Sequence, residues 1–277
     1  MTLVNKLSQL AFALAFLNCL LVTWMLTMMV HVVPFLGSRR QRESYSIAIS
    51  SLMFRYLMVK PCPWIRVRGV NELYESLAEA GKERAAPYII ANHNSKLDSL
   101  LITALLPTWL GPRLRSLIKK ALFDEPLFGG ICERVGHFAV YYKGAKEGEF
   151  GVNKEAQASV ARAMDEFVAN DGGLLIFPEG QLNRNSRKVQ TLRRGAFSLP
   201  IKHGKAIWAF LNVGCERCWP TNSAIGGIPA NIYVKLIKVT DDASAFDTIA
   251  LAEHAQQVMQ RELDKMYAVC DGELKQA

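Results

Sequence analysis

The sequence predicts an α/β fold in which a single mixed, largely parallel sheet is flanked by helices and preceded by an N-terminal membrane helix or helical hairpin. From about residue 64 onward, short β-rich runs alternate with segments of helical periodicity, the pattern of such folds. A long uncharged apolar segment comes before them. Half of the 277 residues are hydrophobic, which is ample for one substantial core and argues against disorder.

Strands are expected where β-branched and aromatic residues cluster between polar stretches. These runs are residues 64–70, 88–91, 138–142, 174–177, 207–211 and 232–237. Apolar residues that step by three or four predict helices over 152–168 and 251–270, and a further helix is expected to begin near Leu97. The polar stretches 81–84 and 143–154 are expected to be loops.

The N-terminal segment 10–33 carries no formal charge and predicts a membrane helix. As a helix it would extend about 36 Å, enough to cross a hydrocarbon layer of about 30 Å. A cleaved signal peptide is a second interpretation, but it would have a shorter apolar core and a small-residue cleavage site. A core helix inside the protein is a third, and it would rarely be this apolar all round.

A second apolar segment, 47–59, is too short to span a bilayer and contains Arg55. It is expected either to lie in the membrane–water interface as an amphipathic helix or to fold back on the first helix as a hairpin. Whether the N-terminal part spans the bilayer or only dips into it therefore stays open. The chain then divides into a membrane anchor, 1–60, and an α/β domain, 61–277. The basic residues within 39–42 follow the first helix and predict that this domain faces the cytosol.

The charge balance points to an anionic partner. Lys and Arg outnumber Asp and Glu by 33 to 25, which suits an anionic membrane or a phosphorylated small molecule. No recognisable nucleic-acid-binding module accompanies this charge, so no nucleic-acid partner is expected. Among the six cysteines only Cys215 and Cys218 are closely spaced, and half a zinc site without a second pair predicts reduced thiols and no metal.

A histidine and an aspartate stand five residues apart where a predicted strand gives way to a helix. Residues 88–91 form the strand, residues 92–95 are a polar break, and helical character resumes at Leu97. On one continuous helix His93 and Asp98 would point about 140° apart, so they can touch only if His93 lies in the turn. Asp98 would then accept the Nδ1–H of His93 and leave Nε2 free to take a proton.

A second interpretation of the same stretch needs no chemistry. Ser95 and Asp98 match the spacing of a capping box, in which Asp98 serves the helix start and His93 is incidental. On this stretch alone the two interpretations stay open.

A second strand end carries another polar group. Residues 172–180 read as a strand that Pro178 stops, followed by Glu179 and by Gly180, which permits a tight backbone path. Glu179 is expected on the same sheet edge as His93, where α/β folds bind ligands. The basic residues behind it suit a substrate with a hydroxyl and a phosphate, while the plain alternative is a turn followed by a solvated basic stretch.

Other catalytic classes lose their usual support. Neither a Gly-x-Ser-x-Gly elbow nor a Gly-x-x-x-x-Gly-Lys-Ser/Thr loop occurs. The pair of His93 and Asp98 lacks an obvious further histidine that would complete a metal site.

In order along the chain, four blocks resemble those of the glycerolipid acyltransferase superfamily, which includes the 1-acylglycerol-3-phosphate acyltransferases. The blocks are Asn92-His93-x₄-Asp98, Lys120-x-Leu122-x₃-Pro126-x₂-Gly129 with Lys143 beyond it, Phe177-Pro178-Glu179-Gly180, and Arg193-Arg194-Gly195. The resemblance covers about residues 60–215 and makes 61–277 the acyltransferase domain.

The resemblance implies roles for particular residues. His93 would be the general base, and Asp98 would orient it. Glu179 and nearby cations would hold a glycerol phosphate. The candidate substrate-binding residues are Lys120, Lys143, Glu179, Gly180, Asn183, Arg184 and Arg193. Arg113, Arg115 and Lys119 are further cations that can meet a phosphate.

The third block departs from the family pattern. The family usually continues Glu-Gly-Thr-Arg, whereas this chain places Leu182 where that arginine stands, with Arg184 two residues on as a possible substitute. The spacing of Glu179, Gly180 and Asn183 also resembles the tafazzin branch, which transfers acyl groups between phospholipids.

The function implied is a membrane-bound O-acyltransferase that moves a fatty acyl group from acyl-CoA to the free hydroxyl of a lysophospholipid, first of all 1-acylglycerol-3-phosphate, giving phosphatidic acid. Another lysophospholipid acceptor or tafazzin-like transacylation is the alternative. A catalytically silent membrane-bound protein that binds lipid or CoA is an alternative of a different class. No cofactor is expected besides the co-substrate acyl-CoA, and the expected location is a membrane, that of the endoplasmic reticulum in a eukaryote.

Overall fold

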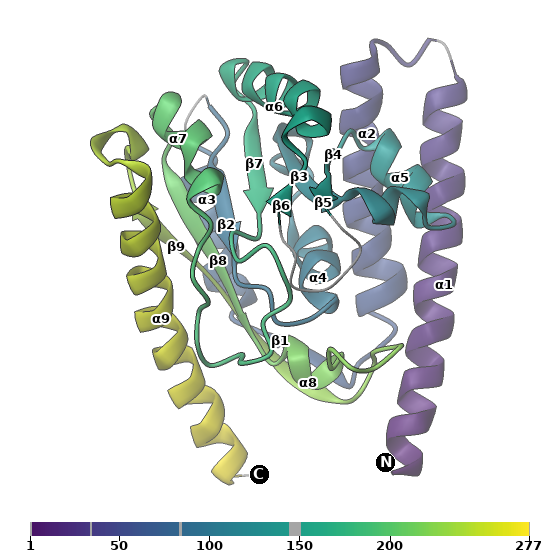
Figure 1. The fold of residues 1–277 in the computed structure, drawn as a ribbon. Coiled ribbons are helices and arrows are strands. Elements are labelled where there is room, and N and C mark those ends of the chain that lie inside the picture. The colour runs from purple at the N-terminus through teal and green to yellow at the C-terminus, as the bar shows by residue number, and fades with distance from the viewer. Residues whose placement is uncertain (1, 34, 83–84, 144–150, 277) are drawn as a thin grey trace. The chain divides into compact units, whose positions relative to one another are not determined.

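A computed structural model of the chain describes residues 2–33, 35–82, 85–143 and 151–276. Seven strands form one sheet in the order β1-β9-β8-β2-β7-β3-β4. Strands β1 and β9, β2 and β8, β3 and β7, and β3 and β4 pair in parallel, and β8 and β9 pair antiparallel. The predicted single mixed, largely parallel sheet flanked by helices is therefore confirmed (Figure 1).

The strands of this sheet follow the predicted apolar runs, with one addition. They are β1 (Ile65–Arg68), β2 (Tyr88–Ala91), β3 (Leu114–Lys119), β4 (Phe138–Val140), β7 (Gly173–Ile176), β8 (Ile207–Val213) and β9 (Ala230–Thr240). A separate antiparallel pair joins β5 (Tyr142–Lys143) to β6 (Gly151–Val152). Every residue of β2, β7 and β8 is buried, as expected for central strands covered on both faces.

The first two helices of the chain begin before the segments 10–33 and 47–59 that were predicted for them. They are α1 (Leu3–Val32), α2 (Arg39–Met53), α3 (Val70–Ala80), α4 (Leu97–Leu105), α5 (Phe128–Arg134), α6 (Lys154–Ala169), α7 (Ser198–Lys202), α8 (Cys215–Cys218) and α9 (Thr248–Gln276). The π-helix Phe54–Val59 continues α2, and the 3₁₀ turns are Gly111–Arg113, Lys120–Asp124, Arg194–Phe197 and Ala243–Ala245.

One sequence prediction is extended here and one needs correction. The basic stretch after the first helix is the first turn of α2, and the orientation that it predicts for the domain stays a prediction. Ser38 and Gln41 close a capping box there, which starts the helix eight residues before the predicted apolar segment. The predicted loop 143–154 contains strand residues at both ends and the first residue of α6, while residues 144–150 of that prediction lie outside the described residues.

The chain consists of two compact units. The first comprises Met1–Leu14, Cys62–Leu100 and Ile176–Ala277, and it contains β1, β2, β8 and β9, with α3 packed against β9 and α9 along β8 and β9. The second comprises Ala15–Pro61 and Leu101–Leu175, and it contains α2, α5, α6, β3 and β4. The predicted division into an anchor, 1–60, and a catalytic domain, 61–277, concerns attachment to a membrane and stays a prediction.

Candidate active site

His93 lies in the turn that joins strand β2 to helix α4. The strand ends at Ala91, where it pairs with Phe210 of β8, and α4 begins at Leu97. Residues 92–95 are buried or half-buried and only Lys96 among residues 92–96 is exposed, so most of this loop is packed into the first unit. The predicted position, at a strand end just before a helix, is the observed one.

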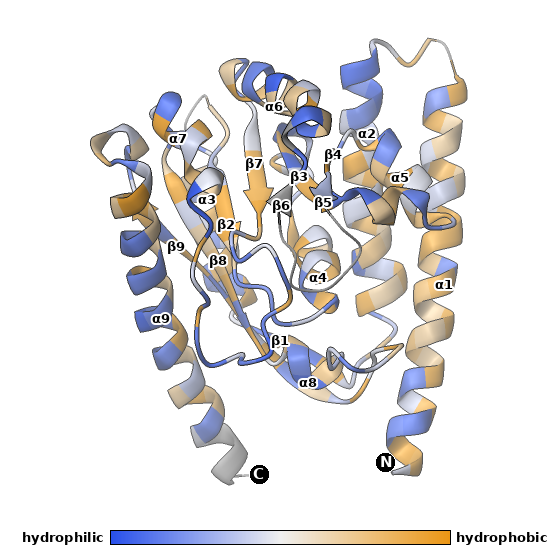
Figure 2. Cartoon of the chain, in the orientation of Figure 1, coloured by the Kyte–Doolittle hydropathy of each residue, from blue (hydrophilic) through white to orange (hydrophobic). Residues whose placement is uncertain are grey.

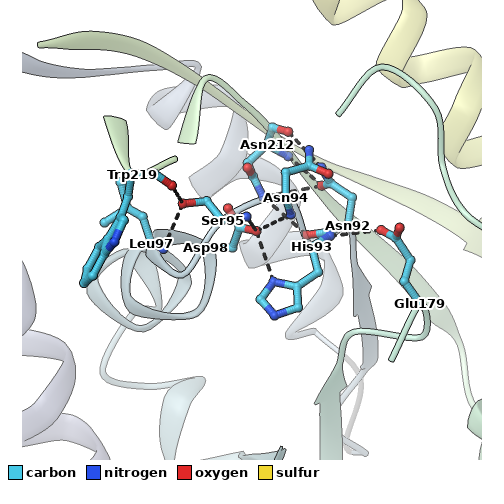
Figure 3. A network of polar contacts seen from close by, with 9 residues as sticks. All are labelled: Asn92, His93, Asn94, Ser95, Leu97, Asp98, Glu179, Asn212 and Trp219. Carbon is cyan, nitrogen blue, oxygen red and sulfur yellow. Dashed lines mark hydrogen bonds and ion pairs between the residues drawn. The ribbon is translucent and has the colours of Figure 1, made fainter. Parts of the chain in front are cut away.

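The imidazole of His93 contacts the carboxylate of Asp98, as the spacing predicted (Figure 3). The distance from His93 Nδ1 to Asp98 Oδ2 is 3.1 Å, and Asp98 is fully buried. The same oxygen accepts the backbone N–H groups of Asn94, at 2.6 Å, and Ser95, at 2.8 Å. Because a nitrogen that faces this acceptor must donate, we assign the proton to Nδ1, which leaves the lone pair on Nε2.

The two interpretations of this stretch hold together. Asp98 reaches back to the N–H of Ser95, which is the carboxylate half of a capping box, and it also holds the histidine ring. The Ser95 hydroxyl accepts the N–H of Leu97 and donates to the carbonyl of Trp219, at 2.7 Å. The backbone at the start of α4 therefore holds the carboxylate of Asp98 in place, and this carboxylate in turn orients the imidazole of His93.

A ring stack holds the other side of the imidazole. The centroids of His93 and Phe177 lie 4.1 Å apart with the ring planes inclined by 25°. The side chain of His93 keeps about a fifth of its surface exposed, at 21%. The base candidate is thus oriented from several directions and still accessible.

Glu179 lies beside His93, but its carboxylate is turned into the protein. It is 2% exposed. Oε1 accepts the backbone N–H of His93, at 3.0 Å, and Oε2 accepts that of Gln190, at 3.3 Å. Burial raises the pKa of Glu179, and the N–H groups of His93 and Gln190 oppose this shift. The predicted meeting of the two strand ends is therefore observed.

Asn183 organises the loop that follows Glu179. Its N–H donates to the carbonyl of His93, at 2.6 Å. Its side chain accepts from the N–H of Asn185 and from the amide of Gln190, and it donates to the carbonyl of Lys188. Asn183 is 3% exposed, so its side chain is buried and its described contacts are all with other residues of the protein.

Gly180 and Arg193 are brought together. Gly180 has a φ of +70°, and a Cβ added to it would lie 2.3 Å from Nε of Arg193. The N–H of Arg193 donates to the carbonyl of Pro178, at 2.9 Å. Arg193 and Arg184 are both exposed, and the Arg193 side chain lies directly over the Gly180 backbone.

The other predicted cations belong to the second unit. Lys120 is half-buried and forms an ion pair with Asp124, and this hydrogen bond raises the pKa of Lys120. Lys143 ends strand β5 opposite Gly151, and its side chain lies outside the described part of the structure. Arg115, expected among the phosphate cations, is instead buried, at 1% exposed, and paired with Glu43, so that expectation was wrong for Arg115.

Sequence reasoning missed a pair of buried asparagines behind the histidine. The Asn92 side chain donates to the carbonyl of Asn212 and accepts its N–H, both at 2.9 Å. The Asn92 side chain therefore ties the end of β2 to β8, just before His93. An asparagine inside the otherwise apolar run 207–213 was the available signal.

The cysteines provide no nucleophile. All six are free and buried. Burial, followed by the charge of nearby Asp98, raises the pKa of Cys215 well above its usual value, and burial raises that of Cys218 to about 12. A buried thiol with a raised pKa is unreactive. Within the described ranges, no group of three or more His, Cys, Asp or Glu residues is arranged to hold a metal ion.

The chain is an α/β protein that presents a carboxylate-oriented histidine at the end of a parallel strand, an arrangement suited to acid–base chemistry. The chain belongs to the acyltransferase family, whose model matches residues 65–211. This range contains His93, Asp98, Glu179 and Arg193.

A solved structure has the same fold. The 1-acyl-sn-glycerophosphate (LPA) acyltransferase PlsC from Thermotoga maritima matches with a TM-score of 0.70, over 95% of this chain and 96% of that chain. The two sequences are 17% identical, so the likeness shows a common fold. No curated protein matches the chain at a significant level.

Proposed function

We propose that the protein transfers a fatty acyl group from acyl-CoA to the free hydroxyl of a lysophospholipid at a membrane, with 1-acylglycerol-3-phosphate as the leading acceptor. The observation that carries this proposal is the contact between His93 Nδ1 and Asp98 Oδ2, which leaves Nε2 as a base. Membership of the acyltransferase family supplies the reaction type.

The reaction follows from this geometry. Nε2 of His93 removes the proton from the acceptor hydroxyl while its oxygen attacks the thioester carbonyl. The new C–O bond forms, the C–S bond breaks, and the CoA thiolate leaves and takes the proton from the imidazolium. Asp98 stabilises that imidazolium. Positioned base catalysis of this kind contributes about 10²–10⁴-fold. A thiolate is a good leaving group, so the reaction needs no covalent enzyme intermediate.

Arg193 is the cation we assign to the phosphate of the acceptor. It lies over Gly180, next to Glu179, whereas Leu182 stands where the family usually has an arginine. A guanidinium binds a phosphate through two parallel hydrogen bonds, which suits a glycerol phosphate. Arg184, Lys120 and Lys143 stay as secondary candidates.

An activity panel tests the proposal. Purified protein in detergent receives labelled acyl-CoA and a set of lysophospholipids that differ in headgroup. We expect transfer to lysophosphatidate above all other acceptors. Transfer between intact phospholipids without CoA would instead indicate the tafazzin-like reaction, and binding without transfer by the folded protein would indicate a catalytically silent lipid-binding protein.

The same panel includes Arg193→Ala. Loss of the phosphate contact is expected to raise the KM for lysophosphatidate about tenfold or more and to leave the KM for acyl-CoA nearly unchanged. Arg261→Ala, which removes an exposed arginine of α9, is the control for the change in net charge. An unchanged KM in Arg193→Ala would remove Arg193 from the phosphate site.

Helix α1 is the basis for proposing a membrane. It is the one helix, among the described residues, that is long and apolar enough to cross a bilayer. Its apolar character runs along most of its length (Figure 2). The exposed apolar side chains of α1 include Leu3, Val4, Leu7, Leu10, Leu14, Leu17, Leu21, Met25, Met29 and Val32. Its buried residues include the polar Ser8, Gln9, Thr23 and Thr27.

This helix also packs on protein near both ends. In the first unit, Gln9 donates to the carbonyl of Ile225 and Phe12 packs edge-on against Trp219. In the second, Arg134 lies over the ring of Trp24. In each unit, α1 therefore turns one face to protein, and its many exposed leucines fit a helix whose other face lies in lipid. Contact with lipid would suit an enzyme with a palmitoyl substrate, because burying the palmitoyl chain away from water is worth roughly 10 kcal/mol.

Vesicle flotation tests the membrane contact. The wild-type protein is expected to float with vesicles that contain anionic phospholipid. The triple variant Leu10→Glu, Leu14→Glu, Leu17→Glu is expected to lose most of this binding, because it places three charges on the exposed face. Val269→Glu, a charge at an exposed apolar position of α9, is the control. Equal flotation of the triple variant would contradict a lipid-facing α1.

A further inference from the structure

We infer that Glu179 is a positioning residue, which holds the peptide of His93 in place and does not bind the acceptor. The inference rests on the proposed function, because it concerns how the base of that reaction is held. It departs from the role in holding glycerol phosphate that the third sequence block implies.

Both oxygens of the Glu179 carboxylate already have backbone partners. Oε1 accepts the N–H of His93, and Oε2 accepts the N–H of Gln190 (Figure 3 shows the first of these). With 2% of its surface exposed, the residue offers almost nothing to a substrate. A second carboxylate beside an anionic phosphate would also repel it, whereas a carboxylate beside the imidazolium that forms during turnover stabilises it.

The same loop holds the other side of the His93 peptide. The N–H of Asn183 donates to the carbonyl of His93, at 2.6 Å, so both backbone groups of the histidine bind the segment that follows β7. Phe177, from the start of this segment, stacks on the ring. Glu179 and Asn183 therefore fix the peptide, Asp98 fixes the ring nitrogen, and Phe177 fixes the ring plane.

Gln190 closes this arrangement. Its N–H binds Glu179, its amide donates to Asn183 Oδ1 at 3.0 Å, and its amide oxygen accepts from Gln181 at 2.9 Å. The loop 181–190 is thus folded back onto Glu179 by its own amides. Burial raises the pKa of Glu179, so keeping its charged carboxylate inside the protein costs free energy. The structural gain from this carboxylate is its two contacts with backbone N–H groups.

The experiment is Glu179→Gln, read by the separate effects on kcat and KM. The substituted amide has the same shape, but its NH₂ group must face one of the two backbone N–H donors. We expect kcat to fall about 10–100-fold while the KM for the acceptor and for acyl-CoA stay within about twofold, because misplacing a base slows the chemical step without weakening substrate binding. Glu179→Asp, which keeps an acceptor-only carboxylate, is expected to recover part of this kcat.

The matched control is Asp247→Asn. Asp247 also accepts two backbone N–H groups, those of Ile249 and Ala250, but it does so on the exposed start of α9. It is expected to leave kcat and KM unchanged. A higher KM for the acceptor with kcat retained in Glu179→Gln would overturn the inference and restore the substrate-binding role.

Hydrogen–deuterium exchange gives a readout that does not depend on activity. In Glu179→Gln the backbone amide of His93 loses its carboxylate acceptor, so the peptide that contains residues 92–98 is expected to exchange faster, and the same peptide in Asp247→Asn is not. Unchanged exchange would contradict the contact itself. If the wild-type protein proved inactive on every acceptor, the proposed function would fail, while this exchange measurement would still decide how His93 is held.

Discussion

Replacing His93 with alanine is expected to lower kcat by about 10²–10⁴-fold and to leave the protein folded, because the variant loses the only base oriented at this strand end among the described residues. The KM for both substrates is expected to change little, since the imidazole acts in the transition state. The loss should appear equally with any acceptor that the wild-type enzyme uses.

The measurement is single-turnover acyl transfer at saturating acyl-CoA, with far-UV circular dichroism to confirm the fold. His254→Ala is a close control, because that ring also has one nitrogen bonded, to the carbonyl of Val239, and also stacks on a phenylalanine, Phe246. It is expected to keep its activity. A folded His93→Ala protein that turned over at the wild-type rate would remove His93 as the base and with it the proposed mechanism.

The parts of the fold that were predictable are those whose signal is local. Strands β2 and β8 are fully buried, so their sequences are almost entirely apolar, and these runs were recognised directly. Helix α9 was expected because its apolar residues repeat at helical spacing, and its observed bounds extend a few residues beyond them.

Strand β3 was missed because its buried charge has a distant partner. Arg115 and Ser116 interrupt an apolar run, and an arginine there suggests a surface position. The residue is buried because Glu43, on helix α2 and 72 positions earlier, pairs with it, and because it lies over the ring of Phe167. No local pattern carries that information. The polar first turn of α2 was missed although a local signal, the capping-box spacing of Ser38 and Gln41, was present.

In the candidate site, too, the local contact was predictable and the distant contacts were not. The contact between His93 and Asp98 was predictable, because five residues and a polar break allow few geometries. What Glu179 contacts was not, because its partners are backbone N–H groups, which every residue but proline carries and no sequence pattern marks. The pairing of Asn92 with Asn212 joins positions 120 residues apart and was equally hidden.

Asp98→Asn is expected to lower kcat by roughly 10²–10⁴-fold and to reduce the stability of the fold by about 1–3 kcal/mol. The amide can be placed in two ways, and both are unfavourable. With its NH₂ at the position of Oδ2, it opposes the N–H groups of Asn94 and Ser95. With its oxygen there, it buries an NH₂ at the position of Oδ1, which has no hydrogen-bond partner among the described residues.

Either placement removes the charge that stabilises the imidazolium, so the second orientation, which keeps the ring contact, would still be slow. The decisive measurement combines the two substitutions. If Asp98 acts through His93, adding Asp98→Asn to His93→Ala should lower kcat no further, whereas two independent contributions would multiply. The double variant would still show the stability loss in chemical unfolding, because either placement of the amide leaves a buried polar group without a partner. Multiplied losses of kcat would mean that Asp98 contributes to turnover by a route that does not pass through the imidazole.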